Sequence, residues 1–353
     1  MRNIFKLFFP KKMVGIDIGT SSVKVVELSL SGHGKTLENY GEIQSASLYR
    51  ANLLASEKGS QALSADFAAK AIKAILKEAK IKTTSAIFSI PDFSTFCTSF
   101  EMPAMPEKEI SGAVRYNASQ FITLPISEVT LDWKIISKPA AGSGLMKVFL
   151  VAVPNQVVQE YQAIAKNAGL DLYALEAEAL GIARVLARDN KKTVCVMDIG
   201  VQSSTVNIIE NGFLHRSYSF NFYSNQLSRA VAAALNIEIA EAAKITQKEG
   251  ILSSRPGIAK ALYLVVDPLL LEIKNICAEF YQQQQREVQE IYLAGGTANL
   301  PGLKEYFAES LKKPVSVPNC FADFLYPPIL EGELKEMSPS FSSAVGVAMG
   351  GIA

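Results

Sequence analysis

The chain has 353 residues, of which 49% are hydrophobic and 20% are charged, and its formal net charge is +1. This composition is typical of a globular protein, so it excludes an intrinsically disordered chain, and the balanced charge gives no indication of a nucleic-acid partner. A single core rarely fills a chain of this length, so we expect two domains or several subdomains.

The N-terminal stretch MRNIFKLFFPKK is short, basic and apolar. It lacks the small-residue cleavage site of a secretory signal, and no later stretch is long enough to predict a transmembrane helix. We expect a terminal tail here, and a modest peripheral contact with a membrane or a partner is the alternative.

An Asp-Ile-Gly turn between two strands opens the folded part of the chain. The apolar run MVGID at 13–17 and the alternating run SVKVVEL at 22–28 predict a hairpin. Further strand patterns lie at 36–46 and 85–91. Between them, residues 64–79 carry apolar side chains at helical spacing, which predicts an amphipathic helix.

Residues 85–165 predict a small α/β insertion with a sheet of its own. A helical pattern follows two prolines in FEMPAMPEKEISGAVRYNASQFI, and two strand patterns, EVTLDWKIIS and MKVFLVAVP, come after it. The next segment, NQVVQEYQAIAKNAGL, predicts a helix that ends at Gly169. A further helix, EAEALGIARVLARD, leads into the second half of the chain.

The second half repeats the opening pattern. The run VCVMDIGVQSSTVNIIENG at 194–212 again places Asp-Ile-Gly and hydroxyl side chains between two strands. Residues 224–283 are helical in pattern, and Pro268 is expected to kink or break the last of these helices. A strand at 290–296, a helix after Pro301 and a closing small-residue helix complete the prediction.

Cysteine and histidine chemistry is sparse. The four cysteines are scattered without a paired motif, which favours reduced thiols in a cytoplasmic protein. His33 and His215 are the two histidines in the sequence, so a histidine-rich metal site is excluded.

A strand that ends in Asp-x-Gly and turns through hydroxyl residues can bind a phosphate. The glycine permits an unusual backbone, the N–H and hydroxyl groups converge on the anion, and the aspartate can hold a hydrated Mg²⁺ beside it. One such turn is common in proteins, but two of them predict like-folded lobes that close on one polyphosphate. The Gly295-Gly296 turn would let an adenosine lie against the backbone, although an ordinary glycine turn is the alternative.

Taken together in this order, the three elements resemble those of the actin-like ATPase superfamily, which includes actin, Hsp70, the sugar kinases and FtsA. The resemblance implies two RNase H-like lobes and a site for ATP with Mg²⁺, which Asp17 and Asp198 would hold through water. Phosphate binding would fall to Asp17, Gly19, Thr20, Ser21, Lys24, Asp198, Gly200, Ser203 and Ser204. Adenosine binding would fall to Glu241, Lys244, Gly295, Gly296 and Thr297.

Some of these assignments have a plain structural alternative. Lys24 would also suit a solvated strand, and Glu241 with Lys244 would also suit an exposed charge pair on a helix. The second phosphate turn departs from actin and Hsp70, which carry extra glycines where this chain has Val201 and Gln202.

Several long runs resemble the PilM family of type IV pilus assembly. They are KMVGIDIGTSSVKVVEL, FEMPAMPEKEISGAVRYNASQFITLPISEVTLDWKII, VFLVAVPNQVVQEYQAIAKNAGL and SAVGVAMGGIA. The resemblance implies an α/β fold of the actin-like ATPase type with an FtsA/PilM-type insertion, subdomain 1C. It predicts lobe 1 (subdomain 1A) at 1–84, 166–190 and 330–353, subdomain 1C at 85–165, lobe 2 (subdomain 2A) at 191–223 and 285–329, and helical subdomain 2B at 224–284.

The same resemblance implies the partners. It predicts that the N-terminal cytoplasmic tail of the inner-membrane protein PilN binds in a groove between subdomains 1A and 1C. The protein would then be cytoplasmic, peripheral to the inner membrane through PilN, and linked to the pilus motor ATPases, and a homo-oligomer is compatible with this assignment. One departure affects the nucleotide, since Tyr223 and Ser224 replace a usual Gly-Gly pair and Ser228 replaces a usual threonine.

Two classes of function remain from the sequence. A nucleotide-gated scaffold is favoured, with at most weak ATPase activity, for which Glu176 is the candidate that orients the attacking water. A first-turn helix glutamate is the structural alternative for this residue. A small-molecule kinase would need a carboxylate base such as Asp171 or Glu176, and an FtsA-like or GspL-like scaffold is a further alternative.

Overall fold

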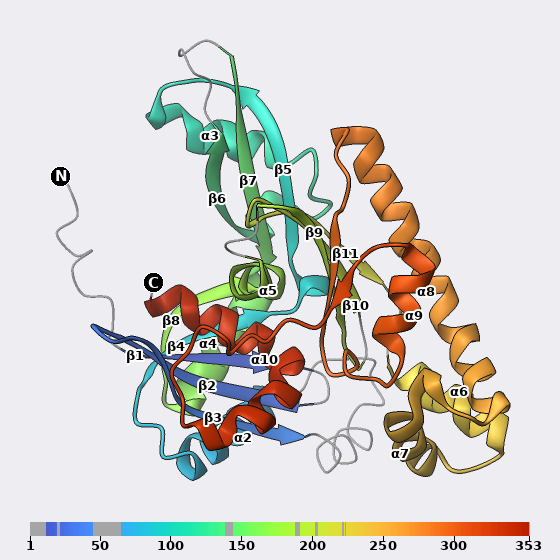
Figure 1. Ribbon diagram of the computed structural model, residues 1–353. Helices are drawn as coiled ribbons and strands as arrows, with labels where there is room; N and C mark the ends of the chain where they lie inside the picture. Colours follow the sequence, from blue (N-terminus) through green and yellow to red (C-terminus); the bar gives the residue numbers. More distant parts are fainter. Residues whose placement is uncertain are drawn as a thin grey trace.

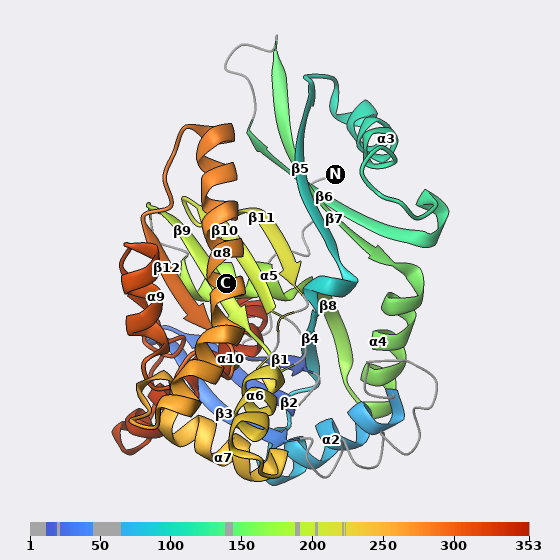
Figure 2. The same cartoon turned by 90° about the vertical axis from the view of Figure 1, so that its right-hand side faces the viewer.

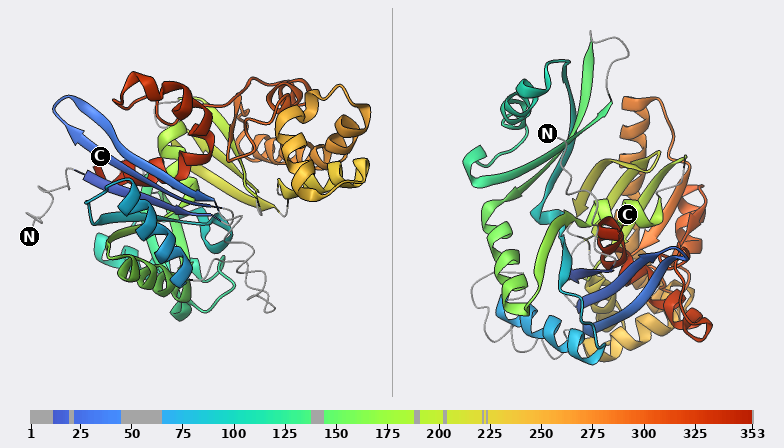
Figure 3. Two further views of the ribbon diagram at one scale, coloured as in Figure 1. Left: turned by 90° about the horizontal axis from the view of Figure 1, so that it is seen from below. Right: turned by 90° about the vertical axis from the view of Figure 1, so that its left-hand side faces the viewer.

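Two five-stranded sheets form the centres of two lobes that lie side by side (Figures 1 and 3). The computed structural model describes residues 12–19, 22–44, 65–137, 144–187, 191–201, 204–220, 222 and 224–352. The lobe 1 sheet has the order β3 (Gly34–Gln44), β2 (Ser22–Ser31), β1 (Lys12–Ile18), β4 (Ser85–Ile90) and β8 (Asp171–Ala177). The lobe 2 sheet has the order β11 (Phe213–Phe220), β10 (Ser204–Glu210), β9 (Thr193–Ile199), β12 (Glu290–Ala294) and β13 (Val315–Ser316).

The strand order and directions of the two sheets are the same. In lobe 1, β1 is antiparallel to β2 and parallel to β4. In lobe 2, β9 is antiparallel to β10 and parallel to β12. The two halves of the chain therefore share one topology, as the repeated Asp-Ile-Gly pattern predicts.

Helices cover both faces of the lobe 1 sheet. Helices α2 (Ala65–Glu78) and α4 (Asn155–Ala168) pack on one face. Helix α10 (Glu331–Ile352) packs on the other face. Helix α4 ends at Gly169, which adopts the left-handed backbone (φ 78°) that glycine tolerates best, as predicted. The alternating pattern of β1 and β2 divides its apolar side chains between these two faces.

The outer layer of lobe 2 is helical. Helices α8 (Pro256–Gln284) and α9 (Leu303–Leu311) pack on the sheet. Helix α6 (Asn225–Leu235) lies beside α8, and α7 (Ile239–Glu249) packs on α6 (Figure 2). The sequence predicts a kink or a break at Pro268, and α8 continues past this proline, so the helix does not break there. The buried leucines and isoleucines on either side of this proline hold the helix together through packing.

A third, smaller sheet projects from lobe 1. It has the order β5 (Phe96–Pro103), β7 (Leu145–Pro154) and β6 (Val129–Ser137), and α3 (Glu107–Ala118) covers it. We call this unit subdomain 1C. The four short 3₁₀ helices of the chain that the structure describes are η2 (Asp92–Ser94), η3 (Ile126–Glu128), η4 (Gly250–Leu252) and η5 (Pro328–Leu330).

On the basis of the packing, we propose to move two of the expected domain boundaries. The predicted insertion at 85–165 includes β4 and α4, but both belong to the layers of lobe 1. Near the C-terminus, Cys320, Phe321 and Phe324 pack in the core of lobe 1 with α10, although the prediction assigned them to lobe 2. We propose that lobe 1 resumes near Cys320.

Helix α5 (Glu178–Leu186) lies at the junction of the lobes. Its side chains pack on the lobe 2 sheet, and the helix also crosses α10 of lobe 1. At this crossing a Cβ built on Gly346 would lie 2.1 Å from the carbonyl oxygen of Gly181, so only glycine fits. The small residues of α10 therefore set how closely the lobes approach.

Three other expectations concern the whole chain. In the described part of the chain, no helix has the length and apolar character to cross a bilayer. All four cysteines are free thiols, as expected. The basic N-terminal tail lies outside the described residues.

Candidate functional site

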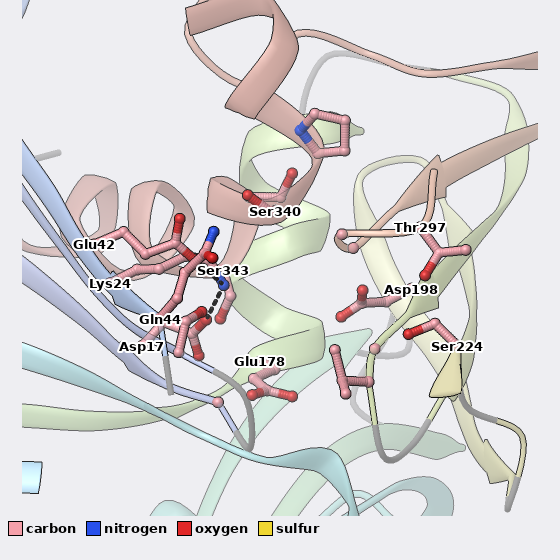
Figure 4. Close-up of a pocket in the computed structure, with 18 of the residues that line it drawn as sticks. Asp17, Lys24, Glu42, Gln44, Glu178, Asp198, Ser224, Thr297, Ser340 and Ser343 are labelled. Carbon is pink, nitrogen blue, oxygen red and sulfur yellow. Dashed lines mark ion pairs between the residues drawn. The ribbon is translucent and has the colours of Figure 1, made fainter. Parts of the chain in front are cut away.

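One cavity opens between the two lobes and both Asp-Ile-Gly strands end in it. Its volume is about 1580 Å³, and its lining includes Asp17 and Gly19 of lobe 1 and Asp198 and Gly200 of lobe 2. Figure 4 shows Asp17 and Lys24 on one side, Asp198 and Thr297 on the other, and Glu178 between them. The two aspartates thus share a single space.

Asp17 is held by side chains of its own sheet. Its Oδ1 accepts a hydrogen bond of 2.8 Å from Ser89 Oγ on β4. Its Oδ2 lies 3.8 Å from Lys24 Nζ, and Lys24 also lies 3.8 Å from Glu42 Oε1. Asp17 and Lys24 are register partners in the β1–β2 hairpin, which explains why a spacing of seven residues joins them. With only 6% of its surface exposed, Asp17 is oriented before any ligand arrives.

Asp198 occupies the corresponding position in lobe 2. Its register partner on β10 is Thr205, which also lines the cavity. Burial raises the pKa of Asp198 to about 7, and the charges of Asp17 and Asp92 add to the rise while Lys24 opposes it. Since Asp17 affects Asp198 across the gap, the two lobes are electrostatically coupled.

The Gly295 turn lies against the second aspartate. Gly295 has φ +82°, and a Cβ there would lie 2.3 Å from Asp198 Oδ1 and 2.5 Å from the carbonyl oxygen of Ile199. Its N–H donates to the carbonyl oxygen of Pro339 on α10 at 2.9 Å, which joins the lobes at this point. Gly296 and Thr297 also line the cavity, and nothing lies near the missing Cβ of Gly296. This glycine therefore leaves space for a flat ligand.

The cavity wall is strongly acidic. The carboxylates that line it are Asp17, Glu42, Glu160, Glu178, Asp198, Glu333 and Glu336. Lys24 and Arg229 are the lysine and arginine of the described lining. A bare polyphosphate would be repelled here, so the residues fit a phosphate ligand that brings a divalent cation. Among the described residues, no group of three or more His, Cys, Asp or Glu side chains could hold a metal ion.

The raised pKa of Asp198 predicts a pH dependence. The folded state binds more protons than the unfolded state between the ordinary value of 3.8 and about 7. The stability of the free protein should therefore increase as pH falls from 8 to about 6. Asp198→Asn removes the charge, so it should raise the melting temperature at pH 8 more than at pH 6. Thermal unfolding of both proteins at the two pH values checks this, and an equal difference at both would contradict it.

The structure describes most of the other predicted site residues. Thr20, Ser21 and Ser203 lie outside the described residues, as does Tyr223. Ser204 is buried in β10 and is absent from the described lining of the cavity.

Three of the predicted site residues, Glu241, Lys244 and Glu176, are absent from that lining. Glu241 and Lys244 are exposed on α7, which presents Ala240, Ala243 and Gln247 to the cavity instead. Glu176 is not in the first turn of a helix but in strand β8, a strand that the sequence reading missed.

Glu176 and Asp171, the two candidate catalytic carboxylates, form hydrogen bonds with other side chains in the structure. Arg184 binds both carboxylate oxygens of Glu176 and also donates to the carbonyl oxygen of Gly346. Glu176 therefore fastens β8 to α5 and α10. Asp171 is exposed, and its Oδ2 accepts a 2.6 Å hydrogen bond from Thr84.

Glu178 lines the cavity in place of Glu176. Burial raises its pKa well above the usual range, and the charges of Asp17, Asp92 and Asp198 raise it further. Its position at the start of α5, two residues after Glu176, is the signal that the sequence reading overlooked. Thr205 was also missed, although the spacing of seven residues that nominated Lys24 would have found it.

A known protein family matches nearly the whole chain. The family model described as "Type IV pilus assembly protein PilM" matches residues 15–352. The chain belongs to the PilM family. This membership agrees with the resemblance read from the sequence and sets aside the FtsA-like and GspL-like alternatives.

Solved structures show the same fold. A structure described as "PilM-PilN type IV pilus biogenesis complex" superposes with a TM-score of 0.82 and 23% identity, covering 98% of this chain and 100% of the other. The ethanolamine utilization protein EutJ from Carboxydothermus hydrogenoformans has a TM-score of 0.58 and 17% identity, covering 96% and 90%. The MamK double helical filament has a TM-score of 0.54 and 10% identity, covering 96% and 98%. These matches confirm the actin-like ATPase fold for this PilM family member.

Proposed function

We propose that this PilM family protein is a nucleotide-gated scaffold, cytoplasmic and peripheral to the inner membrane, in type IV pilus assembly. The observation that carries the proposal is the shared cavity, in which Asp17 of lobe 1 and Asp198 of lobe 2 line one acidic space. A ligand that bridges them would hold the lobes in one closure state. Mg·ATP fits this role because it offers a cation for the carboxylates and phosphates for the glycine turns.

Each part of the cavity has a distinct task in this proposal. Asp17 and Asp198 would hold the Mg²⁺, which would supply positive charge to the phosphates. The turns at Gly19 and Gly200 would receive the phosphates, and Lys24 would add a positive charge beside them. The Gly295-Gly296 turn would receive the adenosine. Glu178, rather than Glu176, would orient the attacking water in any slow hydrolysis.

The partner in the proposal is the N-terminal cytoplasmic tail of PilN. The similar solved structure is described as a complex of PilM with PilN. We propose that the corresponding tail binds this chain between lobe 1 and subdomain 1C, which brings the protein to the inner membrane and connects it to the pilus motors. Closure of the lobes on the nucleotide would then set the shape of that groove.

Calorimetric titration tests the proposal in two steps. The first step titrates Mg·ATP into the protein, and we expect one site per chain that EDTA abolishes. The second step titrates a peptide copying the N-terminal tail of PilN from the same genome, with a scrambled peptide as the control. We expect the native peptide to bind with an affinity that changes when Mg·ATP is present. An absence of peptide binding in both nucleotide states would contradict the pilus role.

A further inference from the structure

Asp92 is a buried acid that the proposed function does not use. It lies in η2, on the segment that joins β4 of lobe 1 to β5 of subdomain 1C. Only 6% of its surface is exposed. The same segment contacts β11 of lobe 2, so Asp92 lies where both lobes and subdomain 1C meet.

Asp92 and the start of α5 bind each other reciprocally. Asp92 Oδ1 accepts a 3.1 Å hydrogen bond from the backbone N–H of Ala179. In the opposite direction, the backbone of Asp92 hydrogen-bonds the carboxylate of Glu178. These reciprocal side-chain to backbone hydrogen bonds resemble a helix capping box, except that the two residues come from distant segments of the chain. The pair fixes where Glu178 stands at the floor of the cavity.

The carboxyl group of Asp92 also contacts lobe 2. The side chains of Thr205 and Asn207 on β10 hydrogen-bond this carboxyl group and lower its pKa, as donors to a carboxylate do. Asn207 Nδ2 also lies 3.4 Å from Thr205 Oγ1. Asp92 Oδ2 and Asn207 Oδ1 are buried without a well-formed hydrogen bond among the described residues, so these contacts are not ideal in geometry.

We propose that Asp92 is a positioning residue that holds Glu178 through the α5 N-terminus and accepts hydrogen bonds from Thr205 and Asn207 of lobe 2. One side chain then connects the start of α5 to strand β10 of lobe 2, at the base of subdomain 1C. The expected effect on Mg·ATP binding rests on the proposed function. The hydrogen bonds of Asp92 exist in the free protein.

The surroundings of Asp92 act on its pKa in both directions. Burial raises the pKa of Asp92 to about 6, and the hydrogen bonds from Ala179, Thr205 and Asn207 oppose this rise. The charge of Asp92 in turn raises the pKa of Glu178 and of Asp198. The thiol of Cys97, packed nearby on β5, has a pKa raised to about 12 by burial and by the charge of Asp92.

Two substitutions of Asp92 test the proposal. Asp92→Asn can keep both contacts, because its oxygen accepts from Ala179 and its amide donates to Asn207. Asp92→Ala keeps neither. We expect Asp92→Ala to weaken Mg·ATP binding about tenfold, because it leaves buried polar groups unpaired. The affinity of Asp92→Asn for Mg·ATP should stay within about twofold of that of the native protein. Asp323→Ala, which removes an exposed acid, is the matched control and should bind normally.

A second measurement uses the free protein and needs no nucleotide. The melting temperatures of Asp92→Ala, Asn207→Ala and the double variant form a mutant cycle, and we expect a non-additive result because the two side chains bind each other. Additive changes would overturn the contact even if Mg·ATP binds. Equal loss of affinity in Asp92→Asn and Asp92→Ala would overturn the positioning role of the hydrogen bond to Ala179. A native protein that fails to bind Mg·ATP would refute the proposed function while the mutant cycle still decides this contact.

Discussion

Replacement of Asp17 or Asp198 by alanine is expected to lower the affinity for Mg·ATP by about 10–100-fold each, the usual effect of losing a group that orients a metal's ligands. The reason is geometric, since the two carboxylates line one cavity from opposite lobes. Neither should be able to replace the other. Because both act on one cation, the double variant should lose less than the product of the single losses. Calorimetry with Mg·ATP and with metal-free ATP measures this effect.

Two controls separate a site effect from a folding effect. Asp171→Ala removes an exposed acid of lobe 1 that lies away from the described lining, so it should bind Mg·ATP normally. Asp198→Ala should also remove repulsion in the free protein, so its melting temperature at pH 8 should not fall. Full affinity in both single variants would show that the cation does not bind between the lobes.

Gly295→Val is expected to abolish nucleotide binding and to destabilise the protein. Its Cβ would overlap Asp198 Oδ1 at 2.3 Å and the backbone of Ile199 at 2.5 Å, and φ +82° is unfavourable for any branched residue. The overlap should displace Asp198 from the cavity and cost about 1–3 kcal/mol of unfolding free energy. Urea unfolding and Mg·ATP titration measure the two effects.

The neighbouring glycine provides the matched control. A Cβ at Gly296 meets no atom within 4 Å, so Gly296→Ala should fold normally and lose affinity only where the added methyl meets the ligand. Normal stability in Gly295→Val would mean that the close contact of this turn with Asp198 is not required.

Local pattern was sufficient to predict the repeated part of the fold. Alternation and the Asp-Ile-Gly turns identified both hairpins, because each strand pairs with its neighbour in sequence. Strand β8 was missed because DLYALEA runs directly into α5 without a turn residue. Without that strand the prediction favoured Glu176, whereas Glu178 is the glutamate of this segment that lines the cavity. Where a strand runs directly into a helix, an error of two residues in the predicted helix start changes which side chain is expected to reach the cavity.

Long-range packing determines the rest of the site. The exposure of Glu241 and Lys244 depends on which face of α7 turns toward α6, and a charged pair in sequence does not reveal this. Asp92 was not singled out because its partners, Ala179 and Asn207, lie far along the chain. Its importance appears only when the two lobes are assembled.

A crystal structure with Mg²⁺ and a non-hydrolysable ATP analogue tests the central claim most directly. We expect one nucleotide in the cavity, with its phosphates between the Gly19 and Gly200 turns and its cation one water layer from both Asp17 and Asp198. Glu178 should face the terminal phosphate, and Gly295 should lie against the adenosine. An analogue bound to one lobe alone, or a cation that approaches only one of the two aspartates, would contradict the account.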